Sequence, residues 1–448
     1  MTETGTTHVL DDAMTRYGGL LRQIPGLLDG SSAEPVAFRW PAPGPRLSSF
    51  HSASGIALHQ LGSRHGHRLF LLDLMRNPRT RTTKTFASLS IVGRAVRHIS
   101  EHGQPVLLIT PTSGNKGTAL RDAVGRAYAA GLVTPDELRI VTVAPAGSRD
   151  KLRDGPLSAT SELRERNPVL LADVERPDAV KQLARQAWQH LNETHGRFLP
   201  WFTLAAANYG VADALRAFAE AELWPVRADS PARVHAHAVS SAYGLLGYHL
   251  GLQLLGGGTT ELGVPARHPG FLLVQQLATP DMVLSLLGRP APPRYEPAPG
   301  GGWSQAGGDA HFPAVTDDPA ERLDPTFYTT APPTAPEMAA LVAAHGGTGV
   351  VVSRRECLDR YEDIGHLLAG TGHELPDNPA EIREWSLVKV LTGVLVAAER
   401  GLLPADADVV VHGSGHYTDE TLPPLPSAAA DEVTSVSDVD AALRKALR

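Results

Sequence analysis

Two patterns of apolar and polar residues alternate along the chain. Short apolar runs, such as those at 106–110 and 234–239, are typical of buried strands. Between them apolar residues recur at helical spacing, as they do over 85–102, which is typical of helices with one buried face. The strands expected lie at 68–74, 106–110, 139–143, 234–239, 349–353 and 408–412, and the helices at 11–28, 85–102, 116–132, 178–191, 205–221 and 384–400, with one more helix directly after 239.

Strands that alternate with helices in this way predict an α/β fold with mostly parallel sheets and helices on both faces. Ligands of such sheets bind beyond the carboxyl ends of the strands. Three turns at predicted strand ends are rich in Gly, Ser, Thr and Asn, namely 112–117, 240–244 and 412–416. A Pro- and Gly-rich stretch near 288–335 interrupts the alternation, either as a long surface excursion or as a disordered linker.

Composition and charge narrow the choice of function. The 448 residues are 42% hydrophobic and 20% charged, which allows a large core, and the length allows two or three domains or one large α/β unit with a subdomain. The net charge of −7 argues against a general nucleic-acid binder, so local groups must attract any anionic ligand. The single cysteine, Cys357, rules out a disulfide framework and a cysteine-based zinc site. Because the sequence has neither a long apolar run nor an apolar N-terminal segment, we expect no membrane span and no signal peptide, and a cytoplasmic location.

Lys84 stands where a loop, NPRTRTT, gives way to a predicted helix. A helix start favours anions, so a lysine is unusual there. Such a lysine is useful as an amine that forms a Schiff base with an aldehyde, which requires a lowered pKa. The alternative is a solvated surface lysine beside Arg76, Arg79 and Arg81.

The three turns suit different ligand groups. In TSGNKG at 112–117, backbone N–H groups, the helix N-terminus and the polar side chains suit a carboxylate. In SSAYG at 240–244, small residues let the backbone approach an anion such as a phosphate. Either turn could also cap its helix without a ligand. HGSGH at 412–416 could reach a ligand lying across the strand ends; no acidic or cysteine residue stands near His412 and His416 at ligand spacing, so we expect no metal site.

The order of these segments resembles that of the fold-type II enzymes that use pyridoxal 5′-phosphate (PLP), the group of threonine synthase, cysteine synthase, serine/threonine dehydratase and the tryptophan synthase β subunit. NPRTRTTK, TSGNKG, SSAYGLLG and HGSGHY follow the order of that group's Schiff-base lysine, substrate-carboxylate loop, phosphate turn and pyridine contact. EWSLVKVLTGVLVAAERGLLPADADVVVHGSG is similar to its final helix and strand. The resemblance covers about 65–420 and implies two parallel-sheet-based α/β domains with the cofactor in the cleft between them.

The resemblance also assigns roles to residues. Lys84 would be catalytic and would carry the cofactor, and Asn115 would lie near the cofactor's 3′-oxygen. Either Ser414 or His412 would meet the pyridine nitrogen. The residues expected to bind the substrate carboxylate are Thr112, Ser113, Gly114, Asn115 and Lys116, and those expected to bind the phosphate are Ser240, Ser241, Ala242, Tyr243 and Gly244.

At the level of the whole chain, the resemblance implies a larger PLP-binding domain formed by 1–84 and 200–448, and a smaller domain formed by 85–199. It also implies a homodimer that acts on a small amino acid substrate.

Several positions depart from that group's pattern. The lysine loop is one residue longer, Thr85-Phe86 replaces an Asp-Arg pair, and Lys116 replaces a threonine. Tyr243 is bulky for a phosphate turn. These changes argue against a standard housekeeping enzyme. They also suggest that Lys116 binds an anionic leaving group or a second carboxylate of the substrate.

We therefore expect a PLP-dependent lyase or transferase that acts on an amino acid by α,β-elimination or by β- or γ-replacement, in a specialised biosynthetic pathway. Lys84 would remove the Cα proton, and a neutral Ser414 at the ring nitrogen would disfavour transamination. The alternative is a degenerate relative that binds PLP or a metabolite without turnover, as a scaffold or partner. The motifs of Rossmann oxidoreductases, P-loop proteins and α/β-hydrolases are absent.

Overall fold

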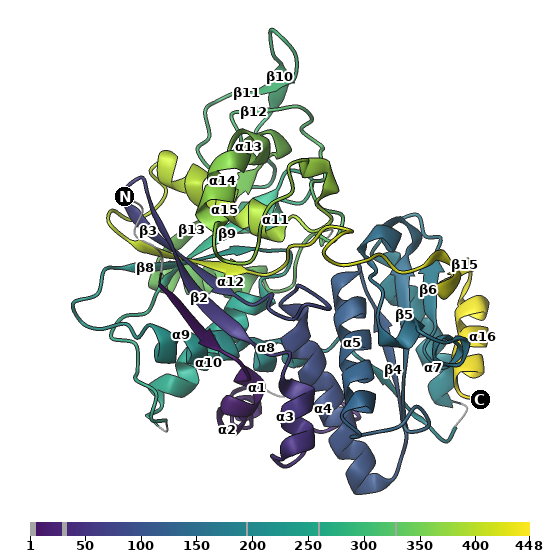
Figure 1. Ribbon diagram of the computed structural model, residues 1–448. Helices are drawn as coiled ribbons and strands as arrows, with labels where there is room; N and C mark the ends of the chain where they lie inside the picture. Colours follow the sequence, from purple (N-terminus) through teal and green to yellow (C-terminus); the bar gives the residue numbers. More distant parts are fainter. Residues whose placement is uncertain (1–5, 29–33, 194–195, 259, 328) are drawn as a thin grey trace.

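The computed structural model describes residues 6–28, 34–193, 196–258, 260–327 and 329–448. Two sheets form its framework, the larger to the left and the smaller to the right in Figure 1. Their strands are mostly parallel and alternate with helices along the chain, which confirms the predicted fold class. Every strand expected from the sequence is present close to its expected position.

The larger sheet has seven strands, five of which run parallel to one another. From β3 onward its neighbouring strands are parallel, whereas the first two are antiparallel additions at the edge. In spatial order the strands are β1 (Thr7–Leu10), β2 (Ile56–Arg64), β3 (His67–Asp73), β14 (Asp408–Gly413), β8 (Arg233–Ala238), β9 (Gly270–Gln276) and β13 (Gly347–Val352).

Helices cover both faces of the larger sheet. One face packs against α15 (Ser386–Glu399), and the other faces the helices α8 (Ala206–Asp213), α9 (Leu215–Leu223), α10 (Tyr243–Gly256) and α12 (Ala335–His345). Alternate residues of β8 point to opposite faces of the sheet, and each set suits the face it meets. Val234 and Ala236 join the core on the α15 side. His235 points the other way, onto Tyr248 of α10.

The smaller sheet is parallel throughout. Its strands are β15 (Asp431–Val433), β6 (Val169–Ala172), β5 (Leu138–Pro145), β4 (Val106–Pro111) and β7 (Leu199–Phe202) in spatial order. On one side it packs against α7 (Ala179–Glu193) and α16 (Val436–Ala446). The helices α4 (Lys84–His102) and α5 (Asn115–Ala129) lie between the two sheets (Figure 1).

The C-terminal segment returns to the smaller sheet. After β14, the chain adds β15 beside β6 and packs α16 against α7. These elements lie outside 85–199, the range in which the sequence places the smaller domain. The boundary itself stays a prediction.

Two expected helices are interrupted. In place of one helix over 11–28, the chain forms α1 (Ala13–Arg16), α2 (Gly18–Leu21) and the 3₁₀ turn η1 (Ile24–Leu27), because Gly18, Gly19 and Pro25 weaken a continuous helix. The helix expected over 205–221 is divided into α8 and α9. At their junction the N–H of Ala217 donates to the carbonyl of Ala214, a 3₁₀-type bond.

The Pro- and Gly-rich stretch folds into a small antiparallel sheet of β10 (Tyr295–Pro297), β11 (Trp303–Gln305) and β12 (Val315–Thr316), which projects at the top of Figure 1. Residue 328 of this stretch lies outside the described residues. The remaining elements are α3 (Pro45–His51), α6 (Ser161–Arg166), α11 (Asp281–Leu286), α13 (Arg354–Asp359), α14 (Tyr361–Leu368), η2 (Ala146–Lys151), η3 (Pro156–Ser158), η4 (Pro379–Glu381) and η5 (Ser427–Ala429). Among the described helices, none has the length and apolar character that crossing a bilayer requires.

Candidate functional site

A cavity of about 210 Å³ lies where the strand ends of the two sheets meet. Because a cavity needs only about 10–15 Å³ on this measure to hold one water, a space of this size admits an organic ligand. The loops after β3, β14, β8 and β4 all contribute to its wall. The sequence-predicted residues that line it are Lys84, Thr112, Ser113, Asn115, Lys116, Ser240, Ser241, Ala242, Tyr243, Gly244 and Ser414.

Lys84 is the first residue of α4, and its half-buried side chain lines the cavity. The loop before it is held against the loop after β14, because the N–H of Thr83 and the hydroxyl of Thr82 both donate to the carbonyl of Ser414 at 3.0 Å. Among the described residues, the Lys84 amine has no hydrogen bond or ion pair. Lys84 thus lines a cavity, half-buried, whereas the alternative interpretation places it on the open surface.

Electrostatics favour the reactive form of this amine. Burial lowers the pKa of Lys84, and the charge of Arg216 lowers it further, while Asp213 and Glu384 oppose the shift. A lowered pKa increases the fraction of neutral amine, which is the nucleophilic form.

The turn at 112–117 has a conformation that only glycine fits at one position. Gly114 has φ +133°, and a Cβ there would lie 2.3 Å from the Cβ of Lys151. Gly114 packs against Lys151 and is not among the residues that line the cavity. The Thr112 hydroxyl oxygen accepts from the N–H groups of Gly114 at 3.0 Å and Gly117 at 2.9 Å. Two of the donors expected to meet a carboxylate are thus bonded within the turn.

Asn115 is fixed by its own neighbours. Its amide nitrogen donates to Glu384 Oε2 at 2.5 Å, and its amide oxygen accepts from the Tyr417 hydroxyl at 2.5 Å. Glu384 also accepts from Lys151 Nζ at 3.1 Å, and the same amine donates to Asp324 at 2.7 Å. Asn115 lines the cavity, but both polar atoms of its side chain are bonded to residues that do not line it.

Lys116 reaches across the cavity wall. Its amine donates to the carbonyl of Thr203 at 2.9 Å and lies 5.6 Å from the centre of the Tyr209 ring. Burial, and then the charges of Lys181 and Lys84, lower the pKa of Lys116 to about 7. Its charge therefore changes near neutral pH.

The turn at 240–244 is backed by an arginine that the sequence did not single out. Ala242 has φ +50° and begins α10. A Cβ on Gly244 would lie 2.5 Å from Arg216 Nη2, so the guanidinium sits directly against the turn. Arg216, on α9, lines the cavity and is held by Asp213 at 2.6 Å. No sequence motif points to it.

Ser414 and His412 occupy different environments. His412 is fully buried, accepts from Arg216 Nη1 at 2.9 Å and lies 2.7 Å from His235 Nδ1, and it is not among the lining residues. Ser414 lines the cavity, and its buried hydroxyl has no hydrogen-bond partner among the described residues. His416 instead approaches the carbonyl of Glu374 at 3.2 Å. Of the two alternatives for the pyridine contact, the fold brings only Ser414 to the cavity.

His237 is a further lining residue that the sequence did not single out. Its Nδ1 bonds the carbonyl of Ala238 at 2.7 Å, so the proton is on Nδ1. Burial, and then the charge of Arg216, lower the pKa of His237 well below its ordinary value. Its buried Nε2 has no partner among the described residues and, with the proton on Nδ1, can only accept a hydrogen bond. The sequence could have pointed to His237, because the alternation RVHAHA of β8 places two histidines on one face of the strand.

The cavity concentrates positive charge in a chain that is negative overall. Lys84, Lys116, Lys181 and Arg216 line it, and no Asp or Glu does among the described lining residues. Such a wall suits a ligand with more than one anionic group.

Comparisons with known proteins concern the whole chain. A model of a family of unknown function, DUF6002, matches residues 13–447. No curated protein matches. The solved structures that are similar include threonine synthase from yeast, with a TM-score of 0.54 and 12% identity over 90% of this chain and 83% of that one. PLP-bound threonine synthase from Brucella melitensis gives 0.50 and 14% over 86% and 80%. The chain therefore has the fold of the fold-type II PLP enzymes, as the resemblance in its sequence implied.

Proposed function

The chain belongs to the DUF6002 family, and from its site we propose that it is a PLP-dependent enzyme acting on an amino acid, with Lys84 as the residue that binds the cofactor. The observation that carries the proposal is the Lys84 amine, which has no partner among the described residues and stands in a cationic cavity between the two sheets.

The residues around the cavity fit the groups of this cofactor. The free amine of Lys84 suits an aldehyde. The turn at 240–244, with the Arg216 guanidinium against it, suits a phosphate. The unpartnered hydroxyl of Ser414 suits a ring nitrogen, which would satisfy its missing hydrogen bond.

When bound, PLP stabilises negative charge at the Cα of an amino acid. Lys84 would take the Cα proton as general base. Ser113 and Lys116, both on the cavity wall, would hold the anionic groups of the substrate. With Ser414 as a neutral partner of the ring nitrogen, loss of a β or γ leaving group is favoured over transamination. We thus propose α,β-elimination or β- or γ-replacement.

The test is a panel of amino acids with leaving groups on the β or γ carbon, assayed with added PLP in D₂O. Proton NMR follows exchange at Cα, and a coupled assay follows 2-oxo acid release. We expect exchange in the wild type and in Lys445→Ala, an exposed control. In Lys84→Ala exchange should fall about 10²- to 10⁴-fold, since the general base is lost.

Exchange that is equally fast in Lys84→Ala would contradict the role of this lysine. Binding of PLP without Cα exchange on any substrate would favour the alternative of a degenerate binder.

A further inference from the structure

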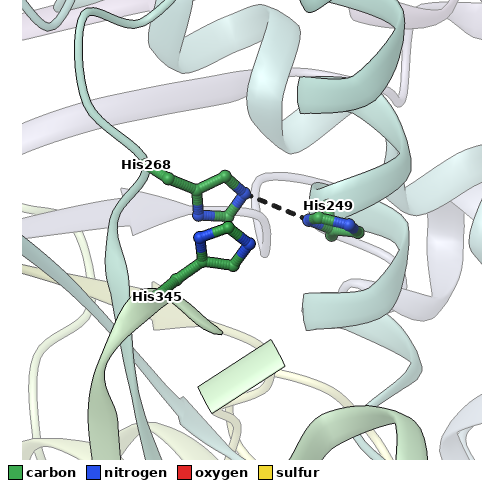
Figure 2. Close-up of side chains that lie close together, drawn as sticks. All are labelled: His249, His268 and His345. Carbon is green, nitrogen blue, oxygen red and sulfur yellow. Dashed lines mark hydrogen bonds between the residues drawn. The ribbon is translucent and has the colours of Figure 1, made fainter. Parts of the chain in front are cut away.

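Three histidines, His249, His268 and His345, lie close together with their rings facing one another (Figure 2). His249 lies on α10, His268 directly precedes β9, and His345 ends α12. One ring nitrogen from each lies within 4.8 Å of the other two. His249 Nδ1 is 3.1 Å from His268 Nε2, and the rings of His268 and His345 stack with centroids 3.5 Å apart. None of the three lines the cationic cavity.

The environment leaves room for a ligand. All three histidines are half-buried. His268 and His345 line a separate cavity of about 110 Å³, together with Pro231, Gly270 and Gly346. Solvent can reach the rings of His268 and His345 through this cavity.

We propose that His249, His268 and His345 form a binding site for one divalent transition-metal ion, with water completing the coordination. Three imidazoles and an open fourth position are a donor set that zinc accepts. Calcium and magnesium prefer oxygen ligands, which this donor set lacks.

His268 is already oriented in the manner of a metal ligand. Its Nδ1 donates to the carbonyl of Pro269 at 3.1 Å, so its Nε2 is an acceptor, which the Nδ1–H of His249 meets at 3.1 Å in the absence of an ion. Histidines that bind metals are commonly oriented by such a bond on their second nitrogen.

To bind an ion, the rings of His249 and His268 must exchange the hydrogen bond between them for two metal bonds, with the His249 proton moved to its Nε2. In tetrahedral zinc with bonds of about 2.05 Å, ligand nitrogens are about 3.4 Å apart. The His249–His268 pair is near that spacing at 3.1 Å. His345 must tilt out of its stack on His268, because the lone pairs of parallel rings do not converge. As the last residue of α12, it has freedom to do so.

An ion at this site would stabilise the turn at 240–244 indirectly, through α10 and α12. α10 begins at that turn, and Thr334, which precedes α12, donates its hydroxyl to the carbonyl of Ser241 at 2.6 Å. His249 and His345 lie farther along these same two helices. The ion would therefore tie the middle of α10 to the end of α12, two helices whose first residues lie at or next to the turn. Its binding does not depend on the proposed PLP chemistry.

The test uses the full chain, dialysed free of metal and then equilibrated with micromolar zinc chloride. Metal analysis should give one zinc per chain in the wild type, and cobalt(II) in place of zinc should give the intense visible absorption of four-coordinate geometry. Zinc should also raise Tm, because it binds the folded state.

The variants His249→Gln and His345→Gln should lose the zinc, the cobalt absorption and the Tm shift. The matched control replaces both His98 and His102, a neighbouring pair on α4 whose ring centroids are 4.6 Å apart, with Gln; it should retain all three. Circular dichroism and the Tm without metal check that each variant folds, and two separate variants guard against one that does not. The proposal is overturned if the wild type binds no zinc, if both variants keep it, or if the α4 control loses it.

Discussion

At the scale of single residues, we predict that the charge of Lys116 decides how well the cavity binds a substrate with a second anionic group. Its amine lies on the cavity wall, and burial first, then Lys181 and Lys84, lower its pKa to about 7. Only the protonated amine attracts an anion. For substrates with a second anionic group, KM should therefore rise about 10-fold between pH 6 and pH 8, as the charged fraction falls.

Two variants separate this effect from other titrations. Lys116→Arg keeps its charge throughout, so it should flatten the pH dependence. Lys116→Ala should lose activity only with substrates that carry a second anionic group. An unchanged substrate profile in Lys116→Ala would contradict the assignment.

Sequence motifs could reveal the site residues that stand in them, but not those that reach the cavity only through packing. Lys84, Asn115 and Ser414 stand in local loops after strands, so motif order alone locates them. Arg216 and His237 acquire their places by packing: one through the approach of α9 to the turn at 240–244, the other through the face of β8 that turns toward α9 and α10. His412 stands in a motif, but the alternation of β14 directs its ring to Arg216 and His235.

At the scale of elements, α10 owes its position to small residues. A Cβ on Gly251 would lie 2.6 Å from the carbonyl oxygen of Ala214 and 2.7 Å from the Cβ of Ala217. Gly251→Ala should therefore push α10 away from α9 and cost about 1–3 kcal/mol in the free energy of unfolding. Urea denaturation measures this loss.

Gly256→Ala on the same helix is the matched control. Nothing lies within 4 Å of the Cβ it would add, so helix propensity should make it neutral or stabilising by up to about 1 kcal/mol. Equal stabilities for the two variants would show that α10 is not closely packed at Gly251.

The sequence predicted the long elements better than the short ones. The regular spacing of apolar residues over α4 and α15 predicts both helices. Apolar residues also occur between Gly18 and Pro25, but these residues favour short turns over one helix. β9, with the sequence GFLLVQQ, meets the same criterion as the predicted strands and was overlooked. β15 has three residues, too few for a pattern, and exists only through its pairing with β6.

At the scale of the whole molecule, a buried ion cluster joins the two sheets. Lys151 follows β5 of the smaller sheet, and its partners Asp324 and Glu384 lie on the side of the larger one. Burial alone would lower the pKa of Lys151, but the two carboxylates hold it above its ordinary value. Lys151→Met would leave both buried carboxylates without the positive charge of this lysine. It should lower the free energy of unfolding by about 3–5 kcal/mol.

Thermal unfolding checks this prediction, with Lys445→Met as the control. The exposed Lys445 makes only a long contact of 3.9 Å with Glu165, so its loss should change stability by about 0.5 kcal/mol or less. A Lys151→Met protein as stable as the control would mean that the cluster does not hold the sheets together.

The whole-chain expectations were the least accessible from the sequence. The return of β15 and α16 to the smaller sheet depends on contacts across the molecule that no local pattern records. The homodimer and the cytoplasmic location stay predictions, because each concerns surroundings that lie outside one chain.

The central claim is that Lys84 binds PLP covalently, and borohydride labelling tests it most directly. Protein mixed with PLP is scanned for a yellow absorbance band, reduced with borohydride, digested and mapped by mass spectrometry. We predict the band in the wild type and in Lys116→Ala, with the label on the peptide that contains Lys84, and neither band nor site-specific label in Lys84→Ala. A wild type that stays colourless, or a label spread alike over the lysines of the wild type and Lys84→Ala, would contradict the account.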